Sequence, residues 1–153
     1  MTNQWANFNA HLDLPVGTGP TAGNPIAIDE LADLYRGYIA CLNARDWVRL
    51  GDFVHVDVRR NGERLGLEGY RRLLEDDFRA IPDLRFDVRL LVVEPPRIAA
   101  RLAFDCTPEG MLFGMPVDGR RVRFAEHVFY EVADGRIATV WSIIDQAAIA
   151  AQL

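Results

Sequence analysis

Three carboxylates of this 153-residue chain stand on segments whose inward-facing residues are otherwise apolar. Asp145 ends an apolar, β-branched run that follows the turn Asp134-Gly135. Asp77 falls near the middle of the apolar face of a predicted helix, and Glu126 interrupts the apolar row of a predicted strand. An acid in an apolar space is costly unless it is paired, capping or working, and desolvation raises its pKa. The three residues therefore suit general acid–base catalysis near neutral pH.

An arginine and several aromatic residues are predicted to face the same space. Arg60 continues the apolar row of Val54, Val56 and Val58, so a cation ends an otherwise hydrophobic strand face. An arginine there lowers the pKa of a neighbouring acid or holds an anionic or carbonyl group of a ligand. We expect the flat walls and hydroxyl donors of the pocket to come from Tyr38, Tyr70, Tyr130 and Trp141, with Asn61 and Phe113 as further substrate-binding residues.

Each polar residue also has a structural interpretation that needs no function. Asp145 stands before Gln-Ala-Ala-Ile and is a suitable helix N-cap, while Glu126 and Arg60 are suited to a buried ion pair. Asp77 is able to hydrogen-bond a tyrosine or the backbone, and Asn61, followed by a glycine, is typical of a turn. Convergence of several such residues on one cavity favours a functional site over these interpretations.

The elements that position these residues are predicted from hydrophobic periodicity and turn signals. Helices are expected over residues 27–44, 47–51 (capped by Asp46) and 67–80, with a short helical turn over 146–153. Strands are expected over residues 54–60, 84–93, 98–106, 121–132 and the closing run 134–145. This order predicts an α+β domain with helices on one face of a curved antiparallel sheet.

Strict alternation assigns the faces of the predicted strands. Over residues 84–93 it places Leu90 and Val92 on the core face. In the closing strand it places Asp145 on the same face as Trp141 and Ile143. Because this strand is almost continuously apolar, we expect it to be buried on both faces.

The bulk composition argues against several classes of protein. The net charge of −5 is unfavourable for binding nucleic acid. Neither a signal peptide nor a membrane span is predicted, and Cys41 and Cys106 are expected to be free thiols of a cytoplasmic protein. The sequence has no Gly-rich phosphate loop and no set of residues at metal-ligand spacing, so no cofactor is predicted. Residues 1–26 are expected to form an N-terminal arm before a single domain over 27–153.

Three motifs resemble one known family. They are Pro82-Asp83-Leu84, then Phe113-Gly114-Met115-Pro116 with Gly119-Arg120-Arg121-Val122, and finally Asp134-Gly135-Arg136-Ile137 followed by Trp141 and Asp145. Over residues 28–153 the chain is similar to the SnoaL-like polyketide cyclases, or ester cyclases, of the nuclear-transport-factor-2-like superfamily. The resemblance implies a conical α+β barrel, in which a strongly curved antiparallel sheet wraps around a long N-terminal helix.

The resemblance also implies a reaction. Characterised members of the family close a ring of an aromatic polyketide by intramolecular aldol condensation, without metal or cofactor. Their general acid/base is the aspartate after the tryptophan, which matches Asp145. Many members carry a histidine at the end of the first strand, where this chain has Arg60-Asn61. The expected protein is a cofactor-independent cyclase, or a related lyase or isomerase, that takes a small apolar or aromatic carbonyl-containing ligand and forms a homodimer through the sheet.

A second hypothesis is a non-catalytic module of the same fold that binds a small ligand or serves dimerisation. It predicts that Asp145 caps the last helix and is salt-bridged to Arg60. A cavity of roughly 300 Å3 or more that reaches Asp145 would favour the enzyme instead.

Overall fold

The computed structural model of the chain describes residues 27–153, and the predicted N-terminal arm over 1–26 lies outside the described residues. The main sheet has the strand order β2-β1-β8-β7-β4-β3. Its strands are β1 (Val54–Arg60), β2 (Glu63–Arg64), β3 (Asp87–Glu94), β4 (Arg97–Cys106), β7 (Val122–Ala133) and β8 (Arg136–Ile144). The pairs are antiparallel except β1–β8, which is parallel. The fold is thus the predicted α+β class with a curved sheet, open along one side and cone-like rather than a closed barrel.

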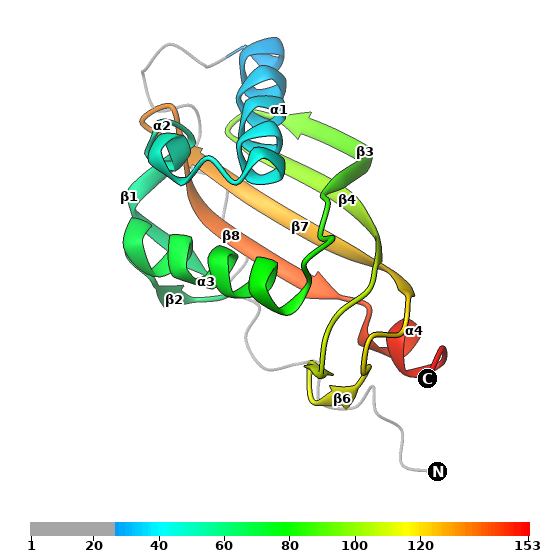
Figure 1. Cartoon of the computed structure of the whole chain (residues 1–153). Coiled ribbons are helices and arrows are strands. Elements are labelled where there is room, and N and C mark those ends of the chain that lie inside the picture. Colours follow the sequence, from blue (N-terminus) through cyan, green and yellow to red (C-terminus); the bar gives the residue numbers. More distant parts are fainter. Residues whose placement is uncertain (1–26) are drawn as a thin grey trace, which may run out of the picture.

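Two long helices, α1 (Ile28–Ala44) and α3 (Gly66–Ala80), pack on the inner side of the sheet (Figure 1). The α1 residues Leu31, Tyr35, Tyr38 and Leu42 are buried because their spacing places them on one stripe of the helix. The helix ends where Arg45 adopts a left-handed conformation with φ 53°. In α3 the same spacing buries Tyr70, Leu74 and Phe78, and Pro82 follows the end of the helix.

Shorter elements close the two ends of the domain. Between α1 and β1 the chain forms the 3-10 helix η1 (Trp47–Arg49) and α2 (Leu50–Phe53), instead of one helix over residues 47–51. Asp46 was predicted to cap that helix, but its side chain makes no capping hydrogen bond. The predicted loop after β4 contains a small hairpin, β5 (Met111–Leu112) and β6 (Met115–Pro116), and α4 (Gln146–Ala150) follows β8.

Irregularities in pairing change which residues face the core. In β3 the register shifts between Val88 and Leu90, so Leu90 and Val92 are exposed and the prediction that they face the core is wrong. A similar shift in β1 exposes Val56, which is 66% accessible. The strands β4 and β7 keep a regular register from Arg97–Glu131 to Cys106–Val122, and their burial follows strict alternation.

No helix within residues 27–153 is long and apolar enough to cross a membrane.

Candidate active site

A cavity of about 210 Å3 lies between the helices α1 and α3 and the inner face of the sheet. Most of its wall is apolar. Its polar lining consists of Tyr38, Arg60, Tyr70, Asp77, Glu126 and Tyr130. All six of these residues were predicted from the sequence to belong to the site, and the fold brings them together from α1, α3, β1 and β7.

Glu126 projects from the middle of β7 into the cavity and is only partly accessible. Burial raises the pKa of its carboxyl group, and this effect is opposed by a hydrogen bond from Ser142 and by the charge of Arg60. The Ser142 hydroxyl donates to Glu126 Oε1 at 2.5 Å. Glu126 therefore combines a proton affinity above the ordinary value with a fixed carboxylate orientation.

Asp77 projects from α3 into the same cavity, where it keeps contact with solvent. The surrounding protein atoms desolvate the carboxyl group and raise its pKa to about 6, while Arg60 acts in the opposite direction. Repulsion by Glu126 adds to the rise. Because Asp77 is still exposed, it sits at the mouth of the cavity and is able to exchange protons with water.

Arg60, at the end of β1, is the cation of this site. Among residues 27–153 no carboxylate oxygen lies within 4.0 Å of its guanidinium nitrogens, so the ion pair with Glu126 considered from the sequence does not form. Its charge nevertheless lowers the pKa of both Asp77 and Glu126. The guanidinium donors are therefore available to a ligand.

Four tyrosines form two hydroxyl pairs beside the cavity, and three of them, Tyr38, Tyr70 and Tyr130, belong to its lining. The hydroxyls of Tyr38 and Tyr70 are 2.6 Å apart, and those of Tyr35 and Tyr130 are 3.3 Å apart. Burial raises the pKa of Tyr70 to about 12, and it raises the pKa values of Tyr38 and Tyr130 well above the ordinary value of a tyrosine. These phenols are thus neutral at physiological pH and act as hydrogen-bond donors.

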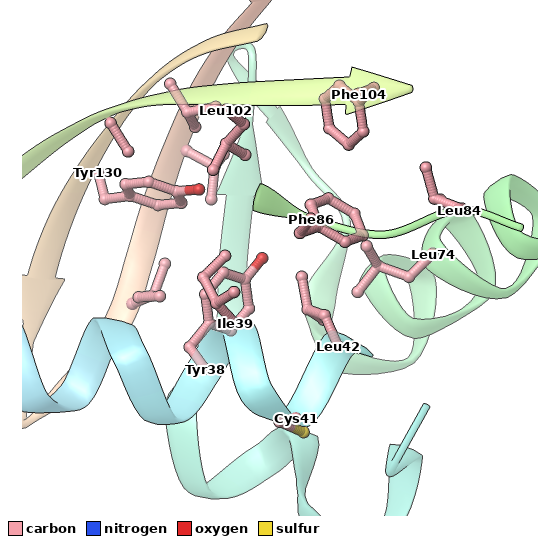
Figure 2. Close-up of a cluster of buried hydrophobic side chains, with 14 of the residues drawn as sticks. Tyr38, Ile39, Cys41, Leu42, Leu74, Leu84, Phe86, Leu102, Phe104 and Tyr130 are labelled. Atoms are coloured by element: carbon pink, nitrogen blue, oxygen red, sulfur yellow. The ribbon is translucent and has the colours of Figure 1, made fainter. Parts of the chain in front are cut away.

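The opposite wall of the cavity is aromatic. The rings of Phe86, Phe104 and Phe124 form a row with centroid separations of 5.4 and 5.1 Å. Figure 2 shows Phe86 and Phe104 across from Tyr38 and Tyr130, whose hydroxyls point into the space between the helix and the sheet. Phe113, at the tip of the β5–β6 hairpin, lines the same cavity and is 44% exposed. A ligand here meets polar groups on one side and aromatic faces on the other.

Asp145 does not line this cavity, and the prediction that it does is wrong. The β7–β8 register shifts so that Val132 pairs with Ile137 but Glu131 pairs with Thr139, which leaves Ala138 as an extra residue. Beyond this bulge the odd-numbered residues of β8 turn to the outer face, where Ile143 is 75% exposed. Asp145 Oδ1 instead accepts a hydrogen bond from the backbone N–H of Ala148 at 3.0 Å and caps α4, the alternative that the sequence had left open.

Two other predicted ligand-binding residues also lie outside the cavity lining. Trp141 follows the same bulge and is 43% exposed on the outer face of the sheet, where its Cα pairs with Phe129. The expectation that β8 is buried on both faces is therefore wrong. Asn61 occupies the turn after β1, with φ 47°, and its side-chain amide bonds to the backbone of Ser142.

Ser142 is the site residue that the sequence analysis missed. It stands inside the apolar run of β8, and strict alternation from Ile137 assigns it to the outer face. The bulge at Ala138 reverses that assignment and turns Ser142 toward Glu126. The only signal in the sequence was a hydroxyl within a strand of β-branched residues. Within residues 27–153 no group of three or more His, Cys, Asp or Glu side chains could hold a metal ion, and Cys41 and Cys106 are free thiols.

The curved α+β cone and its cavity, which contains two acids, define the class of the protein as a single small domain with an internal pocket. Sequence comparison identifies the family. The profile described as "SnoaL-like polyketide cyclase" matches residues 32–153. The chain therefore belongs to the SnoaL-like polyketide cyclase family. No curated protein matches it significantly.

Solved structures agree with this assignment. A SnoaL-like polyketide cyclase from Agrobacterium tumefaciens is 48% identical and superposes with a TM-score of 0.79, covering 80% of this chain and 96% of that one. TsrD from Streptomyces laurentii is 26% identical with a TM-score of 0.74, over 83% of this chain and 96% of that one. IdmH from Streptomyces antibioticus, at 22% identity and a TM-score of 0.69, shares the fold over 79% of this chain and 96% of its own.

Proposed function

We propose that this protein is a cofactor-independent enzyme that moves a proton next to a carbonyl group, in an aldol-type ring closure or a related lyase or isomerase reaction. One observation carries the proposal. Two acids with raised pKa values, Glu126 and Asp77, share a mainly apolar cavity with Arg60, whose guanidinium has no carboxylate within 4.0 Å among the described residues. Membership of the polyketide cyclase family supports the same reaction class.

In this proposal Glu126, rather than Asp145, is the base. Its carboxylate removes a proton from the carbon next to the ligand carbonyl, and the enolate oxygen accepts hydrogen bonds from Arg60 and Tyr70. Tyr70 suits this role because its hydroxyl lies 2.6 Å from that of Tyr38. In the proposal Tyr38 donates to the Tyr70 oxygen, which leaves the Tyr70 proton for the ligand.

The second acid completes the reaction. The enolate carbon attacks a second carbonyl of the same molecule and forms the carbon–carbon bond. The resulting alkoxide takes the proton of Asp77, whose pKa of about 6 keeps part of the population protonated near neutral pH. Glu126 then loses its proton to solvent at the cavity mouth and Asp77 regains one, so that the net reaction is an isomerisation.

The cavity limits the size of the ligand. Its volume of about 210 Å3 is below the roughly 300 Å3 typical of complete small-molecule sites and above the about 150 Å3 that accommodates benzene. One aromatic ring therefore fits between the phenylalanine row and the tyrosines. A larger polyketide would place its reacting carbonyl inside and extend past Phe113 into solvent.

Hydrogen–deuterium exchange tests the proton-transfer step without knowledge of the natural substrate. The probe is 1-indanone, a bicyclic aryl ketone whose α-protons exchange slowly without a catalyst. In D2O the α-proton NMR signal should disappear faster with the wild-type protein than in buffer alone. Glu126→Gln should lower this protein-catalysed exchange rate at least 100-fold. The variant Glu131→Gln, on the same strand but outside the cavity, is the matched control. Exchange that is equal in wild type and Glu126→Gln contradicts Glu126 as the base.

A binding module of the same fold is the alternative, and the modest cavity volume is the observation in its favour. It predicts that 1-indanone perturbs the NMR signals of cavity residues while its α-protons exchange at the rate of buffer alone. The salt bridge from Asp145 to Arg60 that this hypothesis included does not form, since Asp145 caps α4 and Arg60 lines the cavity.

We also propose a homodimer that forms through the outer face of the sheet. Large apolar side chains gather on this face, and cross-strand pairing places them in adjacent rows. They are Leu90, Val92, Phe129, Trp141 and Ile143, which we call the outer apolar face. Each is more than 40% exposed, as expected of a surface that a partner covers.

A further inference from the structure

Glu126 is held by a chain of two polar residues, one on β8 and one in the turn after β1. Ser142 on β8 donates its hydroxyl proton to Glu126 Oε1 at 2.5 Å. Val128 is the Cα partner of Ser142, so Glu126 is the diagonal neighbour of Ser142 on the same face of the sheet. Among residues 27–153 no hydrogen bond reaches the second carboxylate oxygen, Oε2. One oxygen of the carboxylate is therefore fixed and the other is left for the cavity.

Asn61 holds Ser142 in turn. Its Oδ1 accepts a hydrogen bond from the Ser142 backbone N–H at 2.9 Å, and its Nδ2 donates to the Ser142 carbonyl oxygen at 3.4 Å. Its own backbone N–H donates to the carbonyl oxygen of Val140 at 2.9 Å. The side-chain amide thus continues the parallel β1–β8 pairing by one position, beyond the last paired residue of β1.

The backbone of Asn61 makes possible the two hydrogen bonds from its side-chain amide to the Ser142 backbone, which we call the Asn61 clamp. Its φ of 47° is in the left-handed region, where the chain turns away after β1. Asparagine adopts this conformation more readily than other residues with a side chain. Glycine would make the same turn without strain, but it would have no amide to bond Ser142. The turn requirement and the clamp can therefore be separated by substitution.

We propose that Ser142 and Asn61 are positioning residues that fix the Glu126 carboxylate in the orientation needed for proton transfer. The inference rests on the role of Glu126 given above as the proposed base. It accounts for two polar residues that do not themselves line the cavity. It also explains why the bulge at Ala138 matters, because without it Ser142 would face the outer side of the sheet.

The hydrogen bond from Ser142 favours the ionised carboxylate, since a hydroxyl donates to it more strongly than to the neutral acid. The other charged or titratable groups that face Glu126 are Arg60 from β1, Asp77 and Tyr70 from α3, and Tyr35 and Tyr38 from α1. Because these groups are unchanged by substitution at Ser142, a change in the Glu126 pKa reports the lost hydrogen bond.

The test is a carbon-13 NMR titration of the Glu126 carboxyl, assigned by its absence in Glu126→Gln. Ser142→Ala should raise the Glu126 pKa by about one unit, the size expected for one hydrogen bond to a charged group. Ser142→Thr keeps the hydroxyl and should restore the wild-type pKa. Asn61→Gly keeps the turn and loses the clamp, and should shift the pKa in the same direction by a smaller amount. Thermal melts of each variant confirm that it is folded.

Activity supplies the second readout. In the 1-indanone exchange assay, Ser142→Ala should lower kcat about tenfold with little change in KM, because it disturbs the base rather than ligand binding. An unchanged Glu126 pKa in Ser142→Ala, or in Asn61→Gly, overturns the proposed positioning for that residue. The titration needs no turnover. Absence of exchange in the wild type therefore contradicts the proposed function, whereas the pKa shift decides the positioning independently.

Discussion

Asp145 Oδ1 and the backbone N–H of Ala148 are joined by a 3.0 Å hydrogen bond, which makes the last acid of the chain the N-cap of α4. The short helix that it caps carries Ile149, which is fully buried in the core. The bond therefore ties the end of β8 to the hydrophobic core, outside the lining of the cavity.

We expect substitutions of Asp145 to change stability and leave proton transfer intact. Asp145→Ala removes the cap and should lower the free energy of unfolding by about 1 kcal/mol, whereas Asp145→Asn, also a good N-cap, should cost little. Both should exchange 1-indanone protons at the wild-type rate. Urea denaturation and the exchange assay measure the two properties. Loss of exchange in a fully folded Asp145→Asn protein would return the catalytic role to this residue.

The same acid shows where prediction from the sequence reaches its limit. The helices α1 and α3 and the regular strands β4 and β7 follow their hydrophobic periods, so Glu126, Asp77 and the tyrosines were placed correctly. Alternation fails wherever one extra residue enters a strand, because each later side chain then changes face. The bulge at Ala138 in β8 moved Asp145 and Trp141 outward and brought Ser142 inward.

Such bulges are difficult to foresee because they depend on the partner strand. The run over residues 136–144 reads as a regular strand, and only its pairing with β7 shows that Ala138 is unmatched. The β1 irregularity that exposes Val56 and the β3 shift at Leu90 have the same origin. Sequence patterns thus predicted the long helices and strands and most of the cavity wall. They did not predict the short strand β2, the β5–β6 hairpin or the facing of residues beyond an irregular pair.

Asp77 should make stability depend on pH. Its pKa is about 6 in the folded chain and about 3.9 when unfolded, so the folded state binds the proton more tightly. The stability that this provides is present below about pH 4 and is lost as pH rises through 6. Asp77→Asn cannot ionise. Its melting temperature relative to the wild type should therefore rise between pH 4 and 7, by about 2–4 °C.

The expected change in the free energy of unfolding is smaller than the pKa shift of Asp77 alone suggests. A shift of two units corresponds to about 2.7 kcal/mol, but solvent contact at the cavity mouth screens the exposed Asp77, and we expect about 1 kcal/mol. Asp76→Asn, at the neighbouring outward-facing position of α3, is the control. Its melting temperature relative to the wild type should not rise between pH 4 and 7. A pH-independent difference between wild type and Asp77→Asn would refute the raised pKa.

Arg60 should govern ligand binding and the pKa of both acids. Arg60→Gln removes the charge that lowers the pKa values of Asp77 and Glu126, so both should rise in a carboxyl NMR titration. Loss of a charge-assisted hydrogen bond to the ligand carbonyl should raise KM in the exchange assay by about 10- to 100-fold. Arg59→Gln is the matched control, because Arg59 is exposed and donates to the Gly62 carbonyl oxygen at 3.1 Å. Equal effects of the two substitutions would remove Arg60 from the site.

The outer apolar face should decide the oligomeric state. Phe129 and Trp141 are Cα partners near the centre of this face and are 59% and 43% exposed. If two copies pack through it, Phe129→Asp buries an unpaired charge in the interface and should weaken the dimer about 30-fold or more. Sedimentation velocity over a concentration series measures the effect, with Val48→Asp as the control, since Val48 is 95% exposed in η1 and lies outside this face. A wild-type protein that stays monomeric at every concentration would show that the face has another role. If instead the dimer persists in Phe129→Asp, its contacts lie elsewhere on the molecule.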